Sequence, residues 1–123
     1  MSFEVRRSRE AAAQRMDEDW GHLTWLASSE INGSKHLTLG RVVIKKGHRN
    51  PRHGHPNCDE ILYLLAGKLQ HTAGDETVTM EAGDTLFVPA GTFHNALSVG
   101  DGDADMIVAY SSGRRDFQPE HEV

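Results

Sequence analysis

The sequence lacks several features that define other classes of protein. A single cysteine, Cys58, among 123 residues excludes an internal disulfide and is typical of a reducing compartment, so we expect a cytoplasmic protein. No apolar run approaches the roughly 20 residues of a membrane-spanning helix. The charged start of the chain has no apolar stretch behind it, unlike a signal peptide. The sequence therefore predicts no membrane partner.

Basic side chains are also scarce. The 13 lysines and arginines are outnumbered by 18 aspartates and glutamates, which gives a net charge of −5 with neutral histidines. A nucleic-acid surface requires a basic stripe, so this balance argues against such a partner. Histidine, in contrast, is abundant: the chain has 8, and three of them fall between His48 and His55. Their spacing decides whether they form a site.

Crossover helices are missing from the pattern as well. About eight short apolar segments follow one another with turn signals roughly every 8–12 residues, which is typical of an all-β sandwich or barrel. The expected strands cover residues 23–26, 36–44, 60–65, 69–71, 77–80, 85–88, 93–99 and 106–110. Pro51 and Pro56 are expected to keep the histidine-rich loop 48–59 out of regular ladders.

The chain divides into three parts on composition. Residues 1–19 form a charged extension in which Ser8 is expected to cap a short helix running to Met16. Residues 20–113 contain all the expected strands and form the barrel. Residues 114–123 form a polar tail to which the sequence assigns no chemistry.

Three side chains in the histidine-rich stretch suggest a metal site. His53 and His55 are separated by one residue, so in a strand they point to the same face, and Glu60 follows shortly after. Imidazole nitrogens and a carboxylate oxygen that converge on one point suit a divalent transition metal. A later histidine, His94, follows a Pro-x-Gly turn, and a small barrel can bring all four side chains together.

These two stretches resemble the two signature motifs of the cupin superfamily. The first motif is glycine, five residues, His-x-His, three or four residues, glutamate, six residues and glycine. It is matched at every spacing by Gly47, His53, His55, Glu60 and Gly67. The second motif is glycine, five residues, Pro-x-Gly, two residues, histidine, three residues and asparagine. It is matched by Gly83, Pro89, Gly91 and His94, with Ser98 in place of the asparagine.

The resemblance implies a single small double-stranded β-helix, the jelly-roll-like cupin barrel, with a short N-terminal helix or extension. It implies one divalent transition metal held by His53, His55, Glu60 and His94. Iron, manganese, nickel, zinc, cobalt and copper all accept such ligands, so the residue types do not distinguish among them. The asparagine that Ser98 replaces is generally not a ligand, and Ser98 is expected to face the same way as His94.

The resemblance also implies a function. The chain is similar to metal-dependent enzymes that act on a small oxygen-rich molecule, such as a sugar, keto acid or hydroxy acid, by isomerase/lyase or dioxygenase chemistry. Small cupins also serve as non-catalytic binding or sensing modules, and both alternatives remain open. Many small cupins are dimers, so a homodimer is expected, with Trp20, Trp25 and the strand around Val42 as its interface.

Two further side chains have alternative interpretations. His71 shares a predicted strand face with Leu69, so it is either a catalytic general base near the metal or a sheet-packing histidine with one satisfied hydrogen bond. The packing role is favoured, because parity slips easily in a short strand. Cys58 is interpreted as a small buried hydrophobe rather than a further ligand.

Overall fold

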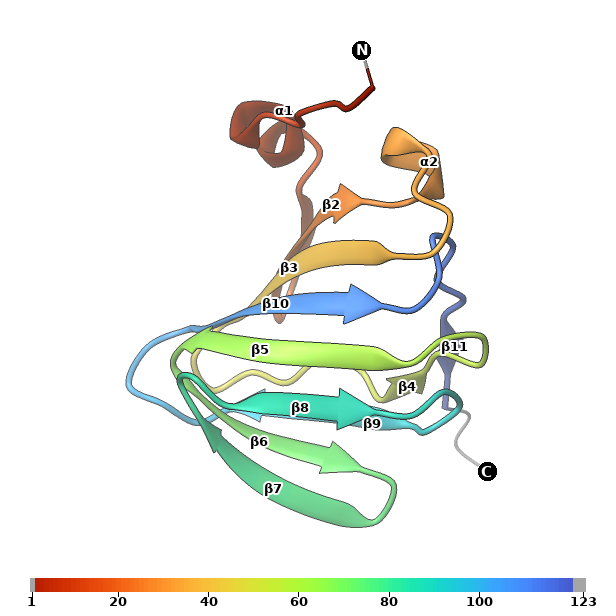
Figure 1. Cartoon of the computed structure of the whole chain (residues 1–123). Helices are drawn as coiled ribbons and strands as arrows, with labels where there is room; N and C mark the ends of the chain where they lie inside the picture. Colours follow the sequence, from red (N-terminus) through yellow and green to blue (C-terminus); the bar gives the residue numbers. More distant parts are fainter. Residues whose placement is uncertain (1, 121–123) are drawn as a thin grey trace.

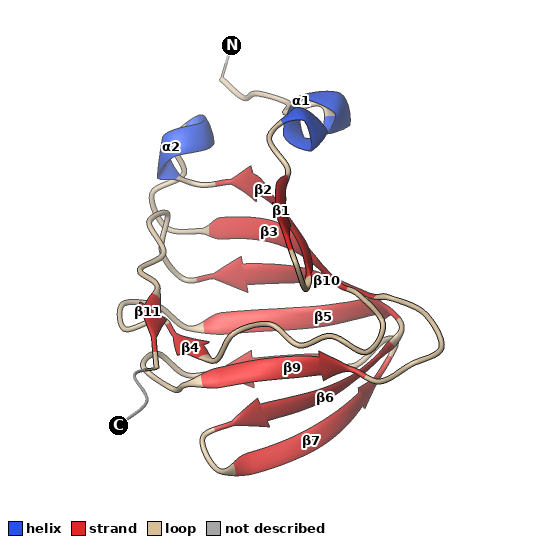
Figure 2. Ribbon diagram, turned by 180° about the vertical axis from the view of Figure 1, so that it is seen from behind, coloured by secondary structure: helices blue, strands red, loops and turns tan. Residues whose placement is uncertain are grey.

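The computed structural model describes residues 2–120, so the end of the predicted tail, 121–123, lies outside the described part. Two antiparallel sheets face each other (Figures 1 and 2). The six-stranded sheet has the spatial order β1 (Met16–Glu18), β2 (Gly21–Ala27), β3 (Thr38–Ile44), β10 (Ala104–Tyr110), β5 (Glu60–Ala66) and β8 (Thr85–Val88). The five-stranded sheet has the order β11 (Gln118–Pro119), β4 (His53–Gly54), β9 (His94–Ser98), β6 (Lys68–Ala73) and β7 (Glu76–Glu81). The prediction of an all-β cupin barrel with a small N-terminal helix is confirmed.

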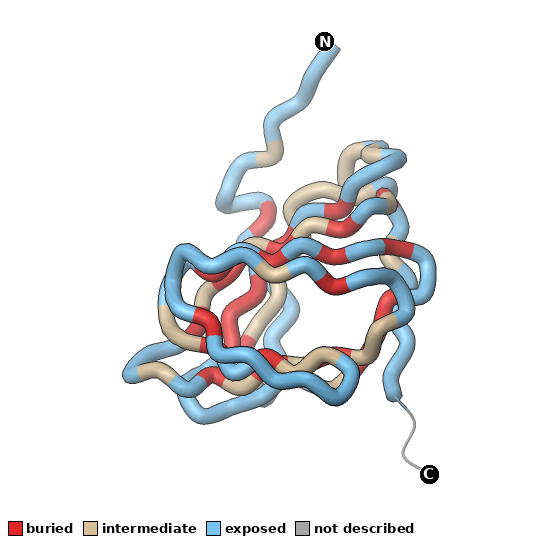
Figure 3. Tube along the Cα trace, turned by 60° about the horizontal axis from the view of Figure 1, so that its bottom comes forward, coloured by how far each residue is buried: buried red, intermediate tan, exposed pale blue. Residues whose placement is uncertain are grey.

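Alternation along the strands builds the core between the sheets. In β5 the side chains of Glu60, Leu62 and Leu64 are buried, while the intervening ones are exposed. β10 follows the same rule, with Met106 and Val108 inside. Successive strand residues point to opposite faces, so each strand gives every second side chain to the interior. Figure 3 shows buried positions alternating with exposed ones along the strands.

A glycine closes the turn between β5 and β6. Gly67 has φ +87°, and a Cβ there would lie 2.7 Å from the carbonyl oxygen of Asp103. A larger residue would therefore strain the backbone at position 67 and collide with the backbone of the adjacent loop at Asp103. This close approach explains why the first motif ends in glycine.

The N-terminal helix differs from its prediction. α1 spans Ser8–Ala13, its N-cap is Arg7 without a side-chain hydrogen bond, and Met16 already belongs to β1. Ser8 is thus the first helical residue and not the cap. Pairing of Met16 with Leu23 in β2 ends the helix early, because a short helix with one buried side chain, Ala11, gains little from another turn. The second helix, α2 (Ser29–Asn32), is capped by the Ser28 hydroxyl and ends at Gly33.

Three of the side chains expected at a dimer interface contribute to the core instead. Val42 is 6% exposed, and Trp20 and Trp25 pack against the core cluster. Val42 shares its strand face with Ile44, which is fully buried, so it is unavailable for a partner. Within residues 2–120, neither helix has the length and apolar character needed to cross a membrane.

Candidate metal centre

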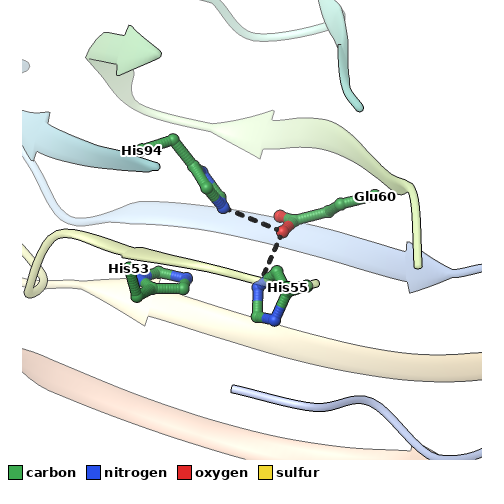
Figure 4. Close-up of side chains that lie close together, drawn as sticks. All are labelled: His53, His55, Glu60 and His94. Carbon is green, nitrogen blue, oxygen red and sulfur yellow. Dashed lines mark ion pairs between the residues drawn. The ribbon is translucent and has the colours of Figure 1, made fainter. Parts of the chain in front are cut away.

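Four buried side chains meet at one end of the barrel, where β4, β5 and β9 begin (Figure 4). His53 opens β4, His55 lies just beyond it, Glu60 opens β5 and His94 opens β9. His53 and His94 are direct partners across the β4–β9 ladder. Each side chain is 8% exposed or less. The structure thus brings together all four residues that the sequence predicted as ligands.

The four groups offer their donor atoms to a common point. One potential ligand atom from each residue lies within 4.8 Å of all the others. The Glu60 Oε1 atom is 3.3 Å from the Nε2 atoms of both His55 and His94, as the dashed lines in Figure 4 mark. Histidine nitrogens and a carboxylate oxygen at this mutual spacing form a donor set that a single transition-metal ion accepts.

Hydrogen bonds at the far side of two rings fix their tautomers. The Nδ1 atom of His53 lies 2.7 Å from the carbonyl oxygen of Pro51, and that of His55 lies 2.9 Å from the carbonyl oxygen of Asp116. A carbonyl only accepts, so each Nδ1 carries the proton and donates. In the neutral ring the Nε2 lone pair then faces the centre, which is the orientation that metal-binding histidines show.

His71 supports the fourth ligand in the same way. Its Nε2 lies 3.1 Å from the Nδ1 of His94, and the two rings stack with centroids 5.2 Å apart. When His94 Nδ1 donates, His71 Nε2 accepts, and His94 Nε2 is left free for the centre. Leu69 and His71 are both buried, so the expected strand parity holds. The nitrogen that would serve as a general base is thus already engaged with a neighbour.

The charges at the centre leave a place for a cation. Burial alone would raise the pKa of Glu60, but the close approach of the His55 and His94 rings outweighs burial and holds that pKa well below its usual range. Desolvation lowers the pKa of His53 to about 4, so its imidazole is neutral at pH 7. Among the described residues, the buried atoms His55 Nε2, Glu60 Oε1 and His94 Nε2 have no hydrogen-bond partner. A divalent cation satisfies all three at once.

A small cavity of about 80 Å³ adjoins His53, Glu60 and His94. It has room for several water molecules or a small organic molecule. Burial and the nearby Glu60 carboxylate raise the pKa of Tyr110 on its wall, so that hydroxyl remains protonated. Most of the wall is apolar, and its polar members are Asn50, His53, Glu60, His71, His94, Tyr110 and Arg115.

The C-terminal part of the chain belongs to the site, although sequence reasoning assigned it no role. Residues 114–120, which we name the closing segment, return to β4 (Figure 1). Asp116 supplies the carbonyl that orients His55, and the ring of Phe117 stacks on His53 with centroids 4.8 Å apart. Both side-chain termini of Asn57 hold the segment, one on the Arg114 carbonyl and one on the Asp116 amide. A lone phenylalanine in a polar tail was the available sequence signal.

The other side chains considered from sequence lie outside the centre. Cys58 is buried in the core cluster, and desolvation raises the pKa of its thiol, in agreement with its interpretation as a small hydrophobe. Ser98 faces inward like His94, as expected, but lies opposite Leu69 farther along the strand. His48 is exposed and hydrogen-bonds to the Lys46 carbonyl.

Comparison with known proteins identifies the family. Residues 40–110, more than half of the chain, match the family described as "Cupin domain". The chain therefore belongs to the cupin family.

Three curated relatives that the chain matches have different names. Germin-like protein 3-8 of Oryza sativa subsp. japonica is 33% identical over 81 residues, which are 62% of this chain and 36% of the relative. Polyketide synthase CurC of Streptomyces cyaneus is 29% identical over 87 residues, or 71% of this chain and 56% of the relative. Oxalate oxidase 2 of Hordeum vulgare is 30% identical over 84 residues, or 62% of this chain and 38% of the relative. The chain thus spans between about a third and just over half of the relatives it matches.

Solved structures show the same fold. A structure of oxalate decarboxylase from Bacillus subtilis, an enzyme with Mn(II) centres, superposes with a TM-score of 0.83 at 22% identity. The match covers 89% of this chain and 31% of that one. At this identity the likeness establishes the architecture of the barrel.

The buried imidazoles predict a pH-dependent stability for the chelator-treated protein. Desolvation lowers the pKa of His53 and of His71 from 6.5 to about 4, so the unfolded chain binds more protons between these values. The contribution of these two neutral rings to the free energy of unfolding is therefore complete above pH 6.5 and is lost as the pH falls toward 4. We expect the free energy of unfolding, measured with urea, to fall by on the order of 3 kcal/mol for each of the two residues between pH 6.5 and pH 4.

Two variants test the origin of this loss. His71→Gln removes one titrating ring and is expected to flatten the pH dependence, while His36→Gln at an exposed position is expected to leave it unchanged. An unfolding free energy of the chelated wild type that stays constant from pH 7 to 4.5 would contradict the assignment.

Proposed function

We propose that His53, His55, Glu60 and His94 bind one divalent transition metal. The observation that supports this most directly is the convergence of three unpartnered, buried donor atoms, with ring tautomers set by hydrogen bonds on the outer nitrogens. The ligand types suit iron, manganese, nickel, zinc, cobalt and copper alike. The Mn(II) centres of the oxalate decarboxylase with the same fold support manganese as the first ion to test.

The proposed reaction is metal-dependent chemistry on a small organic acid, either of the isomerase/lyase type or as a dioxygenase. A bound divalent ion would supply Lewis-acid polarisation of a substrate oxygen. A cavity of about 80 Å³ favours a keto or hydroxy acid of few carbons over a sugar. The relative named as an oxalate oxidase supports the same substrate class.

Side chains around the ligands have defined supporting roles in this proposal. His71 holds His94 through the Nδ1 atom and so fixes its ring, which makes it a positioning residue. Tyr110 stays protonated and offers a hydroxyl donor on the cavity wall. Phe117 covers the face of His53 and keeps water from that side of the centre.

A non-catalytic binding module is the alternative function. It is favoured by one observation: the Nε2 atom of His71, the acid–base candidate, is already hydrogen-bonded to His94. Such a module would bind the same small acid without changing it.

We also propose that a second copy of the chain covers the outward face of the six-stranded sheet. Leu39, Ile61 and Phe87 lie in one row across β3, β5 and β8, with Ala109 of β10 completing it. Tyr63 and Leu65 extend this outer apolar face, and all these side chains except Ala109 are at least 37% exposed. A contiguous apolar surface on a sheet is typical of an interface, and an isologous dimer buries it on both copies.

Metal content is the first test. Purified wild-type protein is expected to carry close to one divalent ion per chain by elemental analysis. The double variant His53→Ala/His94→Ala is expected to carry none, because only two of four ligands remain. His36→Ala and His48→Ala, at exposed positions, serve as controls for histidine content. Retention of the ion in the double variant would contradict the ligand assignment.

Turnover separates the two candidate functions. Manganese- and iron-loaded protein is incubated with oxalate and with two- to four-carbon keto and hydroxy acids, while oxygen uptake and product formation are followed. Oxygen uptake that depends on the acid, with both oxygen atoms recovered in the product, identifies a dioxygenase, and product without oxygen uptake identifies isomerase or lyase chemistry. An acid that raises the melting temperature but is never consumed identifies the binding module.

Light scattering tests the dimer. The wild-type protein is expected to have about twice the 13.6 kDa mass of one chain. Ile61→Asp places a charge at the centre of the outer apolar face and is expected to give the monomer mass. Val78→Asp is the matched control, because Val78 is 49% exposed on the opposite sheet. A monomeric wild type would refute the proposed assembly.

A further inference from the structure

The wall of the cavity contains one guanidinium group. Arg115 comes from the closing segment and lies beside the cavity together with Trp25, Tyr110 and Phe117. Glu60 is the one carboxylate on that wall among the described residues, and it is engaged by His55 and His94. The positive charge of Arg115 is therefore not neutralised by the groups that line the cavity.

Aromatic rings hold the guanidinium beside the cavity. The Cζ atom of Arg115 lies 4.3 Å from the ring centroid of Trp25 and 5.3 Å from that of Tyr110. A cation over an aromatic ring is attracted by the ring face, and this contact does not use the N–H donors of the guanidinium in hydrogen bonds. The group is thus kept at the cavity with donors for a further partner.

Three other arginines of the chain, unlike Arg115, are paired with carboxylates. Arg15, Arg41 and Arg52 each form an ion pair with a carboxylate on the surface. Within residues 2–120, the recorded side-chain interactions of Arg115 are those with aromatic rings. A stacked arginine without a carboxylate partner, beside a small cavity, is arranged to receive an anion from outside the chain.

The charge of the site fits the same conclusion. A divalent ion and the Glu60 carboxylate would together carry one net positive charge, and Arg115 adds another. In a cavity with mostly apolar walls, two uncompensated positive charges favour a ligand with negative charge at more than one point. A small dicarboxylate or oxo-acid meets this requirement, whereas a neutral sugar does not.

We propose that Arg115 is the residue that binds the carboxylate of the small acid and so determines the specificity of the site for anions. This inference rests on the proposed function and adds the group that recognises the substrate class. The guanidinium accommodates two carboxylate oxygens in parallel, which a lysine ammonium does not. The closing segment therefore contributes the specificity group as well as a support for His55.

Binding of oxalate to the manganese-loaded full chain tests the proposal by calorimetry. Arg115→Met keeps aliphatic contact with Trp25 but removes the charge, and it is expected to weaken oxalate binding about 10- to 100-fold. Arg115→Lys is expected to recover part of that loss, because it restores the charge without the paired donors. Manganese content is expected to remain unchanged in both variants.

Arg114→Met is the matched control, because Arg114 is exposed and lines only the outer cleft next to Trp25. Equal oxalate affinity in wild type and Arg115→Met would contradict the role of Arg115 in binding the carboxylate, while the proposed metal-dependent function would be unaffected. Loss of manganese in Arg115→Met would assign Arg115 a purely structural role and also overturn the proposal. Failure of oxalate to bind the manganese-loaded wild type would contradict both the proposed function on small acids and the proposed role of Arg115.

Discussion

The burial of Glu60 is the constraint on which this end of the barrel depends. Its carboxylate is 3% exposed and ionised, and an uncompensated charge in such a place costs several kcal/mol. His55 and His94 approach one oxygen of Glu60, yet their outer nitrogens are already committed to other partners. A cation that joined the group would balance this charge, and in the proposed function binding of a metal would therefore be coupled to the stability of the fold.

Two sheets are needed because no single strand can present this set of ligands. Glu60 begins a strand of the six-stranded sheet, whereas His53 and His94 begin paired strands of the other. Strand alternation sends all three side chains inward at the same end of the barrel, with the same parity as the apolar side chains that follow them. The core positions therefore fix the directions of the ligands, and a register slip of one residue would turn them to the surface.

Sequence patterns predicted most of this arrangement because the relevant signals are local. The His-x-His pair, the glutamate and the later histidine follow motif spacings. β5 and β10, in contrast, carry apolar residues on both faces, so the sequence located these strands without showing which side chains face inward. The short strands β1, β4 and β11 were missed because runs of two or three residues have no periodicity to detect. The burial of Val42 could not be predicted, because an apolar strand alone does not reveal which face is turned inward.

The contribution of the closing segment could not be predicted, because it depends on a contact between positions 61 residues apart. The carbonyl of Asp116 accepts from His55, and a carbonyl carries no sequence signature, since every residue has one. Only folding shows that this particular carbonyl reaches the site.

Three consecutive residues of the closing segment lie at both the candidate metal centre and the proposed anion-binding group. Asp116 orients a metal ligand, Arg115 just before it stacks beside the cavity, and Phe117 just after it covers His53. A displacement of this segment would therefore move the proposed anion-binding group and release the His55 ring together. In the proposed function, selectivity for the acid and the geometry of the metal centre would therefore both depend on one stretch of backbone, which is held in place by Asn57 and by its pairing with β4.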